Sequence, residues 1–161
     1  MADTPSRGAI TKLGIGSTSP VTQAMEFLTC GLKLTTEQLN SPGLRGTRSR
    51  HKDRTRVVRK QVSGPIEFNP STTELDALLT RILSGTGPWV PAETLTKFYV
   101  TVDRVTKVHT YSNCVVSRAT FSGSSGQPVK VTIDVEGVDE TEGNAGTFPA
   151  ITIPAENMFV F

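Results

Sequence analysis

A single helical segment, residues 69–85, stands in a chain whose other patterned segments alternate with the period of a β-strand. Ser71, followed three residues later by Glu74, forms the pattern of a capping box, and Gly85 is typical of a helix end. The apolar residues follow the spacing i, i+3, i+4, i+7 and i+8 of one helical face: Leu75, Leu78, Leu79, Ile82 and Leu83. The pattern predicts one amphipathic helix, packed through this stripe against an apolar surface.

Strand patterns occur in five further segments of the chain. They cover residues 25–35, 56–68, 95–104, 107–122 and 129–135, and the fourth segment is either one long bent strand or two short ones. In the last segment Val129, Val131, Ile133 and Val135 share one face, as in a half-buried antiparallel strand. One helix among about six strands is incompatible with a doubly wound parallel sheet. We therefore predict a mainly β fold, an antiparallel sandwich or partial barrel, with one helix packed on it.

The length of 161 residues suits one domain. Residues 1–23 are rich in Gly, Ser, Thr and Pro, which predicts a flexible N-terminal arm before a single β domain over 24–161. Residues 36–56 lack an apolar period and are predicted to be a long loop, and the acidic, glycine-bearing residues 136–149 a second one. No apolar run approaches the ~20 residues that span a bilayer, and the N-terminus lacks the plan of a signal peptide. We expect synthesis in a cytosol.

Signatures of catalysis are missing from the sequence. It has two histidines, His51 and His109, and neither lies in a zinc or protease motif. The acidic residues Asp139, Glu140 and Glu142 are expected to be solvated, with a weak divalent-ion site as the alternative. We predict no enzyme activity, no cofactor and no metal. Cys30 and Cys114 are predicted to be free thiols, and a disulfide requires that their strands be neighbours.

The strongest charge feature is the basic run from Arg45 to Lys60, in which Asp53 is the only acidic residue. Its eight cations are Arg45, Arg48, Arg50, Lys52, Arg54, Arg56, Arg59 and Lys60, which leaves nine basic residues against fourteen acidic ones elsewhere. Such a run can bind nucleic acid or an acidic surface on another copy of the chain. The run contains no aromatic residue for stacking on bases. The period-two spacing from Arg48 to Arg56 is typical of an extended ribbon with its charges on one side.

Two stretches resemble a known family. They are "SGPIEFNPSTTELDALLTRILSG" over 63–85 and "VTVDRVTKVHTYSNCVVSRATFSGSSGQPVKVTIDVEG" over 100–137. The region from about Arg56 to Gly137 is similar to the tail tube protein, or major tail protein, of long-tailed bacteriophages. The resemblance implies paired antiparallel sheets with one helix, and a structural subunit of the virion tail. It also implies rings, typically hexameric, that stack into a tube through which phage DNA passes without specific binding.

The resemblance also implies partners. They are other copies of the chain and the tape measure, distal tail and tail terminator proteins. In this family the long loop reaches an adjacent subunit, so the basic run is predicted to bind a neighbour's carboxylates. Relatives are often longer, so the ending "PAENMFVF" suggests either a truncated chain or an end docked into a neighbour's sheet. Two alternatives stay open. One is a related tail component (distal tail, hub or tail-completion protein) or a secretion-system tube, and the other is a nucleic-acid-binding β-module that uses the basic run.

Overall fold

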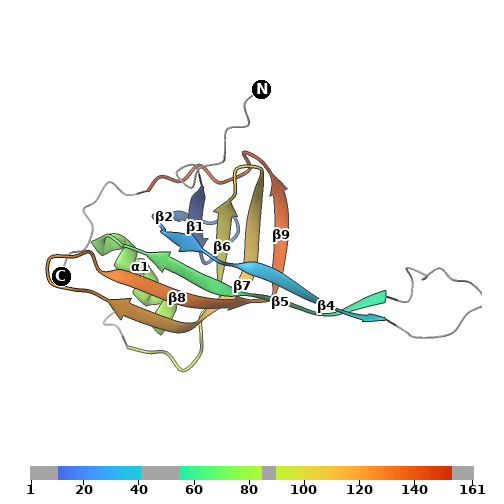
Figure 1. The fold of residues 1–161 in the computed structure, drawn as a ribbon, viewed down its shortest axis with the longest axis horizontal. Helices are drawn as coiled ribbons and strands as arrows, with labels where there is room; N and C mark the ends of the chain where they lie inside the picture. The colour runs from blue at the N-terminus through green and yellow to red at the C-terminus, as the bar shows by residue number, and fades with distance from the viewer. Residues whose placement is uncertain (1–10, 41–54, 85–89, 154–161) are drawn as a thin grey trace, which may run out of the picture.

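The computed structural model describes residues 11–40, 55–84 and 90–153, within which the chain forms nine strands and one helix (Figure 1). The elements in chain order are β1 (Lys12–Gly16), β2 (Gln23–Met25), β3 (Thr29–Cys30), β4 (Lys33–Asn40), β5 (Thr55–Phe68), α1 (Thr72–Leu83), β6 (Phe98–Asp103), β7 (Lys107–Ser122), β8 (Lys130–Gly137) and β9 (Asp139–Asn144). The predicted mainly β fold with one helix is confirmed.

All strand pairs are antiparallel, and the strands form one curled sheet in the order β2-β1-β6-β7-β8-β5-β3. In addition, β4 pairs with β5, and β9 pairs with β7. Figure 1 shows two halves whose strands cross steeply, with β1, β6 and β9 in one half and β5 and β8 in the other. The sheet is therefore a half-barrel that folds over its own core.

Strand β7 belongs to both halves of the sheet. Its first part pairs with β6 and β9, and its second part pairs with β8. The pairing with β6 shifts register between Phe98 and Val100, and Asn113 on β7 has a φ of 53° at this point. A bulge bends a strand and increases its twist, and asparagine tolerates positive φ better than most residues. Residues 107–122 therefore form one long bent strand.

The core lies inside the fold of the sheet. Phe98, Val100 and Val102 of β6 are buried, and so are the alternating residues from Val129 to Val135 on and beside β8. Ile66 and Phe68 of β5 are fully buried against them. The period-two pattern of these segments thus identified their inward faces correctly.

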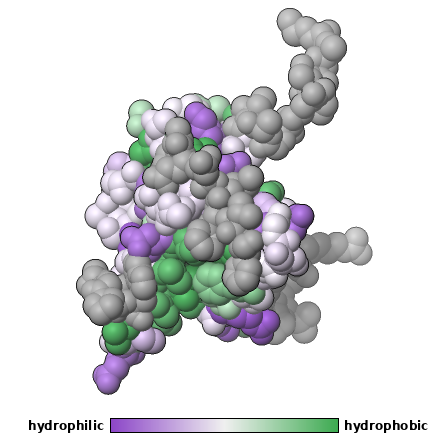
Figure 2. Space-filling view, turned by 90° about the vertical axis from the view of Figure 1, so that its left-hand side faces the viewer, coloured by the Kyte–Doolittle hydropathy of each residue, from purple (hydrophilic) through white to green (hydrophobic). Residues whose placement is uncertain are grey.

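The helix α1 begins as the sequence predicts. Ser71 is the N-cap, its side chain accepts a hydrogen bond from the Glu74 amide, and the Glu74 carboxylate accepts one from the Ser71 amide. Ser84, in the left-handed conformation, is the C-cap. Within the predicted apolar stripe only Leu78 is buried, whereas Leu75 and Ile82 pack against the core and Leu79 and Leu83 stay partly exposed. Figure 2, drawn from the side of α1, shows apolar surface in the centre of this face.

Two predictions about the N-terminal part of the chain are wrong. The flexible arm over 1–23 is wrong for β1, because Leu13 and Ile15 are buried in the core and β1 pairs with both β2 and β6. Residues 1–10 lie outside the described part of the chain. The predicted strand 25–35 is divided among β2, β3 and β4, and Leu28 between them is half exposed. The sequence pattern did not predict β1, because only two of its residues, Leu13 and Ile15, are strongly apolar and the surrounding segment is rich in glycine and serine.

Both predicted loops contain strands. Residues 36–40 belong to β4, and the acidic segment after Gly137 forms β9, which pairs with β7. These segments have few apolar residues because they cover little of the core, so alternation could not reveal them. Residues 41–54, the middle of the predicted loop, and residues 154–161, which hold the ending "PAENMFVF", lie outside the described residues.

β5 carries the Gly64–Pro65 step and is nevertheless an inner strand of the sheet, although proline in a sheet is usually confined to edge strands or bulges. It pairs with β8 on one side through Gly64 and Pro65, and with β3 and β4 on the other. The Gly31 amide donates to the Pro65 carbonyl at 2.8 Å, in the interval between β3 and β4. A Cβ atom at Gly64 would lie 2.3 Å from the Gly31 carbonyl oxygen, so this close approach requires glycine.

Candidate subunit interface

The β4–β5 pair extends beyond the body of the fold as a two-stranded ribbon (Figure 1). In this part Glu37 pairs with Arg59, Gln38 with Val57 and Leu39 with Arg56. Residues 35–39 and 56–60 are all exposed, including Leu39 at 66%, Val57 at 52% and Val58 at 61%. An isolated two-stranded ribbon is marginally stable in water. The exposed branched apolar side chains make this ribbon a candidate contact surface.

The predicted basic run falls partly on this ribbon. Arg56, Arg59 and Lys60 lie on β5, and all three are exposed. The other five cations lie outside the described residues: Arg45, Arg48, Arg50, Lys52 and Arg54. Of the series from Arg48 to Arg56 the structure describes only Arg56, so the one-sided arrangement of the charges stays a prediction.

Lys60 binds within its own chain. Its Nζ lies 2.8 Å from Oδ1 of Asp139, the first residue of β9. The hydrogen bond from Lys60 is the main reason that the pKa of the Asp139 carboxyl lies below its usual range. A second hydrogen bond, from the Glu140 amide, acts in the same direction. Both side chains are more than 40% exposed, so the pair contributes little to stability. It ties the base of the ribbon to the edge of the sheet and shows that the run can take a carboxylate as its partner.

Two edges of the β1-β6-β7 half are free within the described residues. β2 pairs only with β1, and β9 pairs only with β7. Unpaired backbone groups along an edge are a template for another strand. The edge β9 and the root of the ribbon are adjacent, because Lys60 and Asp139 join them.

Charged side chains line the core-facing side of β9. Directly paired residues share a sheet face, and the register places Val102, His109 and Glu142 in one row and Val100, Tyr111 and Glu140 in the next. His109 contacts Glu140 through Nδ1, and Lys107 pairs with Glu142. Lys107 lowers the pKa of the Glu142 carboxyl, and His109 adds a smaller effect in the same direction. The sequence offered Glu140 and Glu142 as part of a weak ion site only in the alternative, and it did not connect them to His109, which lies some thirty residues earlier and reaches them only through the β7–β9 pairing.

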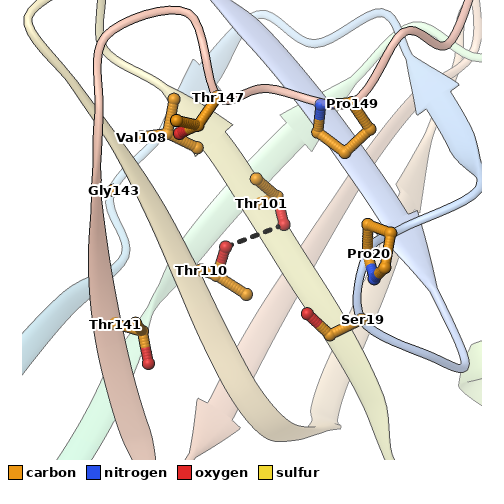
Figure 3. A pocket seen from close by; sticks show the side chains of 9 residues that line it. All are labelled: Ser19, Pro20, Thr101, Val108, Thr110, Thr141, Gly143, Thr147 and Pro149. Carbon is orange, nitrogen blue, oxygen red and sulfur yellow. Dashed lines mark hydrogen bonds between the residues drawn. The ribbon is translucent and has the colours of Figure 1, made fainter.

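The opposite face of this half carries a row of threonines. Thr101, Thr110 and Thr141 are paired across β6, β7 and β9, and the hydroxyl oxygens of Thr101 and Thr110 lie 3.2 Å apart (Figure 3). A pocket of about 210 Å³ surrounds them, and its other lining residues are Ser19, Pro20, Val108, Gly143, Thr147 and Pro149. None of the residues that line the pocket is charged. The pocket therefore has no group suited to acid–base chemistry.

The two cysteines are free, as the sequence predicts. Cys114 is buried and Cys30 is partly buried. Burial raises the pKa of both thiols, and that of Cys114 reaches about 12. Neither thiol is therefore an activated nucleophile.

The model of the phage tail tube protein family matches residues 8–161. The chain belongs to this family. The match covers nearly the whole chain, so the resemblance over 56–137 is confirmed and extended. No curated protein sequence matches the chain.

Three solved structures share the fold of this chain. The SPP1 tail tube has a TM-score of 0.57 and 13% identity over 87% of this chain and 80% of its own. A chain of the anti-feeding prophage baseplate has the same score and identity over 89% and 98%. A chain of the sheath–tube complex of the extracellular contractile injection system PVC has a TM-score of 0.54 and 11% identity over 89% and 95%. At these identities the likeness establishes the fold alone.

As a member of the phage tail tube family, the protein is a structural component of the virion tail and not an enzyme. The one helix in the described part of the chain is too short and too polar to cross a membrane.

Proposed function

We propose that copies of this tail tube protein close into hexameric rings, and that the rings stack into a hollow tube through which phage DNA passes to the host. The observation that carries the proposal is the exposed β4–β5 ribbon, which projects from a folded body with basic and branched apolar side chains on its surface. Within the described residues no third strand pairs with this part of the ribbon, and in the proposed assembly a neighbouring subunit covers it.

The sheet edges supply a second contact for the ring. In this proposal β9 of one subunit lies against β2 of the next, so that the β1-β6-β7 halves continue from subunit to subunit. The ribbon, rooted beside β9, then runs along the neighbour, where its arginines meet carboxylates as Lys60 meets Asp139 in its own chain. The six-fold count follows the family resemblance, and the similar anti-feeding prophage baseplate is described as 6-fold symmetrised.

Charge supports passage of DNA without binding. Outside the basic run the chain has fourteen acidic and nine basic residues. If the arginines are engaged between subunits, the remaining surface is acidic and repels phosphates, which removes binding sites along the channel. The tape measure, distal tail and tail terminator proteins are the proposed partners at the inside and the ends of the tube.

The decisive experiment is the double reversal Arg54→Glu/Arg56→Glu. It leaves alone Arg59, which faces Glu37, and Lys60, which pairs with Asp139. The matched control is Lys33→Glu/Lys97→Glu, which makes the same charge change at two exposed positions outside the projecting part of the ribbon. Negative-stain electron microscopy should show tubes for the wild type and the control, and folded monomers for the ribbon variant. Normal tubes from the ribbon variant would contradict the role of the arginines.

A second candidate is a related tail component, since one similar chain comes from a baseplate. Closed single rings that never stack would favour it. The third candidate is a nucleic-acid-binding module. For such a module we expect DNA affinity that falls steeply with salt and is lost when residues 41–54 are deleted. A DNA titration of the wild type therefore separates it from the tube subunit, for which we expect no measurable affinity at physiological salt.

A further inference from the structure

The cluster at His109 brings three metal-ligating side chains together on the edge of the sheet. His109 of β7 lies directly opposite Glu142 of β9, and Glu140 is two residues away on the same face. Each of the three offers one ligand atom, and these atoms lie within 4.8 Å of one another. We propose that His109, Glu140 and Glu142 form a site for Zn²⁺ or a similar first-row divalent cation. This inference does not depend on the assembly proposed above.

The donor set selects the kind of cation. Imidazole nitrogen and carboxylate oxygen are both ligands of Zn²⁺, and three of them correspond to the number of protein ligands that zinc has where water occupies its fourth position. Mg²⁺ and Ca²⁺ prefer oxygen ligands alone and more of them. Ligand atoms around a tetrahedral zinc lie about 3.3 Å apart, so a span of up to 4.8 Å closes through a small movement of one side chain.

The three side chains differ in burial, so the site has both rigid ligands and access from solvent. His109 and Glu140 are only 14% and 12% exposed, and the His109 ring stacks on Tyr111 with centroids 6.5 Å apart and planes 15° apart. Glu142 is 53% exposed. Two ligands are therefore held in place, while the third can move and leaves a path for the cation and its water.

The cation must displace Lys107 from Glu142, and this ion pair is weak. Lys107 pairs with Glu142, and both side chains are more than half exposed. Because exposed ion pairs contribute little, Lys107 can turn into solvent when a doubly charged ion binds Glu142. When the metal binds, His109 and Glu140 both coordinate it and give up their direct contact. The His109 imidazole must be neutral to coordinate the metal.

Isothermal titration of ZnCl₂ into the metal-free full-length chain tests the proposal. We expect one equivalent of Zn²⁺ to bind the wild type. His109→Ala should weaken binding by more than about tenfold, since even the loss of a partner outside the ligand shell costs about 10–100-fold. The matched control is His51→Ala, which removes the other histidine of the chain and should bind like the wild type.

A second pair of variants keeps the test sharp if His109→Ala unfolds. Glu142→Gln removes a ligand at an exposed position, and Glu136→Gln makes the same change at an exposed glutamate outside the cluster. Glu142→Gln should lose affinity and Glu136→Gln should keep it. Binding that survives both His109→Ala and Glu142→Gln, or no heat of binding up to about 1 mM, a limit that corresponds to about 4 kcal/mol of affinity, would overturn the site and leave a plain network of ion pairs.

Discussion

At the scale of single residues, the Tyr111 hydroxyl ties the two halves of the sheet together. It donates to the Leu32 carbonyl at 3.1 Å, and the Arg104 guanidinium donates to the same carbonyl at 2.7 Å and to the hydroxyl at 3.2 Å. Tyr111→Phe should lower the free energy of unfolding by about 1–2 kcal/mol, because a buried hydrogen-bonded group is lost. Urea denaturation of dilute monomer measures this change.

The control for this change is Tyr99→Phe. Tyr99 is partly exposed, and its hydroxyl makes no hydrogen bond to another described residue. It should change stability by less than about 0.5 kcal/mol. Equal effects of the two substitutions would show that the Tyr111 hydroxyl has no special role.

The same tyrosine predicts a loss of stability in alkali. Burial is the largest influence and raises the pKa of Tyr111 to about 12, with Arg104 opposing it and Glu140 adding to it. Below about pH 10 the hydroxyl is protonated in both folded and unfolded chains, so it has no effect on the pH dependence. Between about pH 10 and 12 only the unfolded chain ionises, which costs the wild type up to about 3 kcal/mol.

Tyr111→Phe removes this contribution, so its stability should fall less steeply over the same pH range than that of the wild type. Urea denaturation at a series of alkaline pH values compares the two slopes. The buried thiol of Cys114 adds an alkaline loss common to both proteins, since its pKa is also raised to about 12. Parallel slopes would show that Tyr111 ionises normally in the folded chain.

At the scale of elements, Glu74 connects the start of α1 to the segment that follows β2. Its carboxylate accepts from the Ser71 amide at 2.9 Å and from the Glu26 amide at 2.8 Å, and the residue is only 3% exposed. Ser71→Ala should cost about 1 kcal/mol, as is usual for the loss of an N-cap. Glu74→Ala should cost more, roughly 2–4 kcal/mol, because two backbone donors lose their acceptor.

Asp76→Ala is the matched control, since Asp76 is an exposed carboxylate in the same helix. Its effect should stay within about 0.5 kcal/mol. Thermal or urea unfolding followed by circular dichroism ranks the three variants. A Glu74→Ala effect no larger than that of Ser71→Ala would mean that the contact with Glu26 does not stabilise the fold.

At the scale of the whole molecule, stability should be distributed unevenly between body and ribbon. Ile66 and Ile133 are paired at the centre of the sheet and fully buried, whereas Gln38 and Val57 are paired on the exposed ribbon. In dilute monomer the ribbon amides should exchange with solvent far faster than the central ones, because no third strand or core supports them. Hydrogen exchange followed by mass spectrometry measures this difference.

Assembly should change this pattern. If neighbours cover the ribbon, as the proposed function requires, its amides gain protection in tubes while those of the central strands stay nearly constant. Ribbon amides that exchange equally fast in monomer and tube would place the subunit contacts elsewhere on the molecule.

The sequence determined the features that depend on local physics. Alternation identified the inward faces of β6 and β8 because their residues lie on one side of a pleated strand against a continuous core. The capping box of α1 could be read directly, because Ser71 and Glu74 satisfy each other's backbone within one turn. The run of cations from Arg45 to Lys60 was equally plain, although its predicted contacts with a neighbour still await an experiment.

The tertiary structure alone decided the features that depend on long-range pairing. β1 and β9 carry weak patterns and become strands because β6 and β7 offer them partners. The same pairing gives Lys60 its contact with Asp139 and brings His109 to Glu140 and Glu142, across separations of 79 and about thirty residues. Hydrogen bonds between strands join residues whatever their distance along the chain, so no local pattern records which edges, charges and ligands will meet.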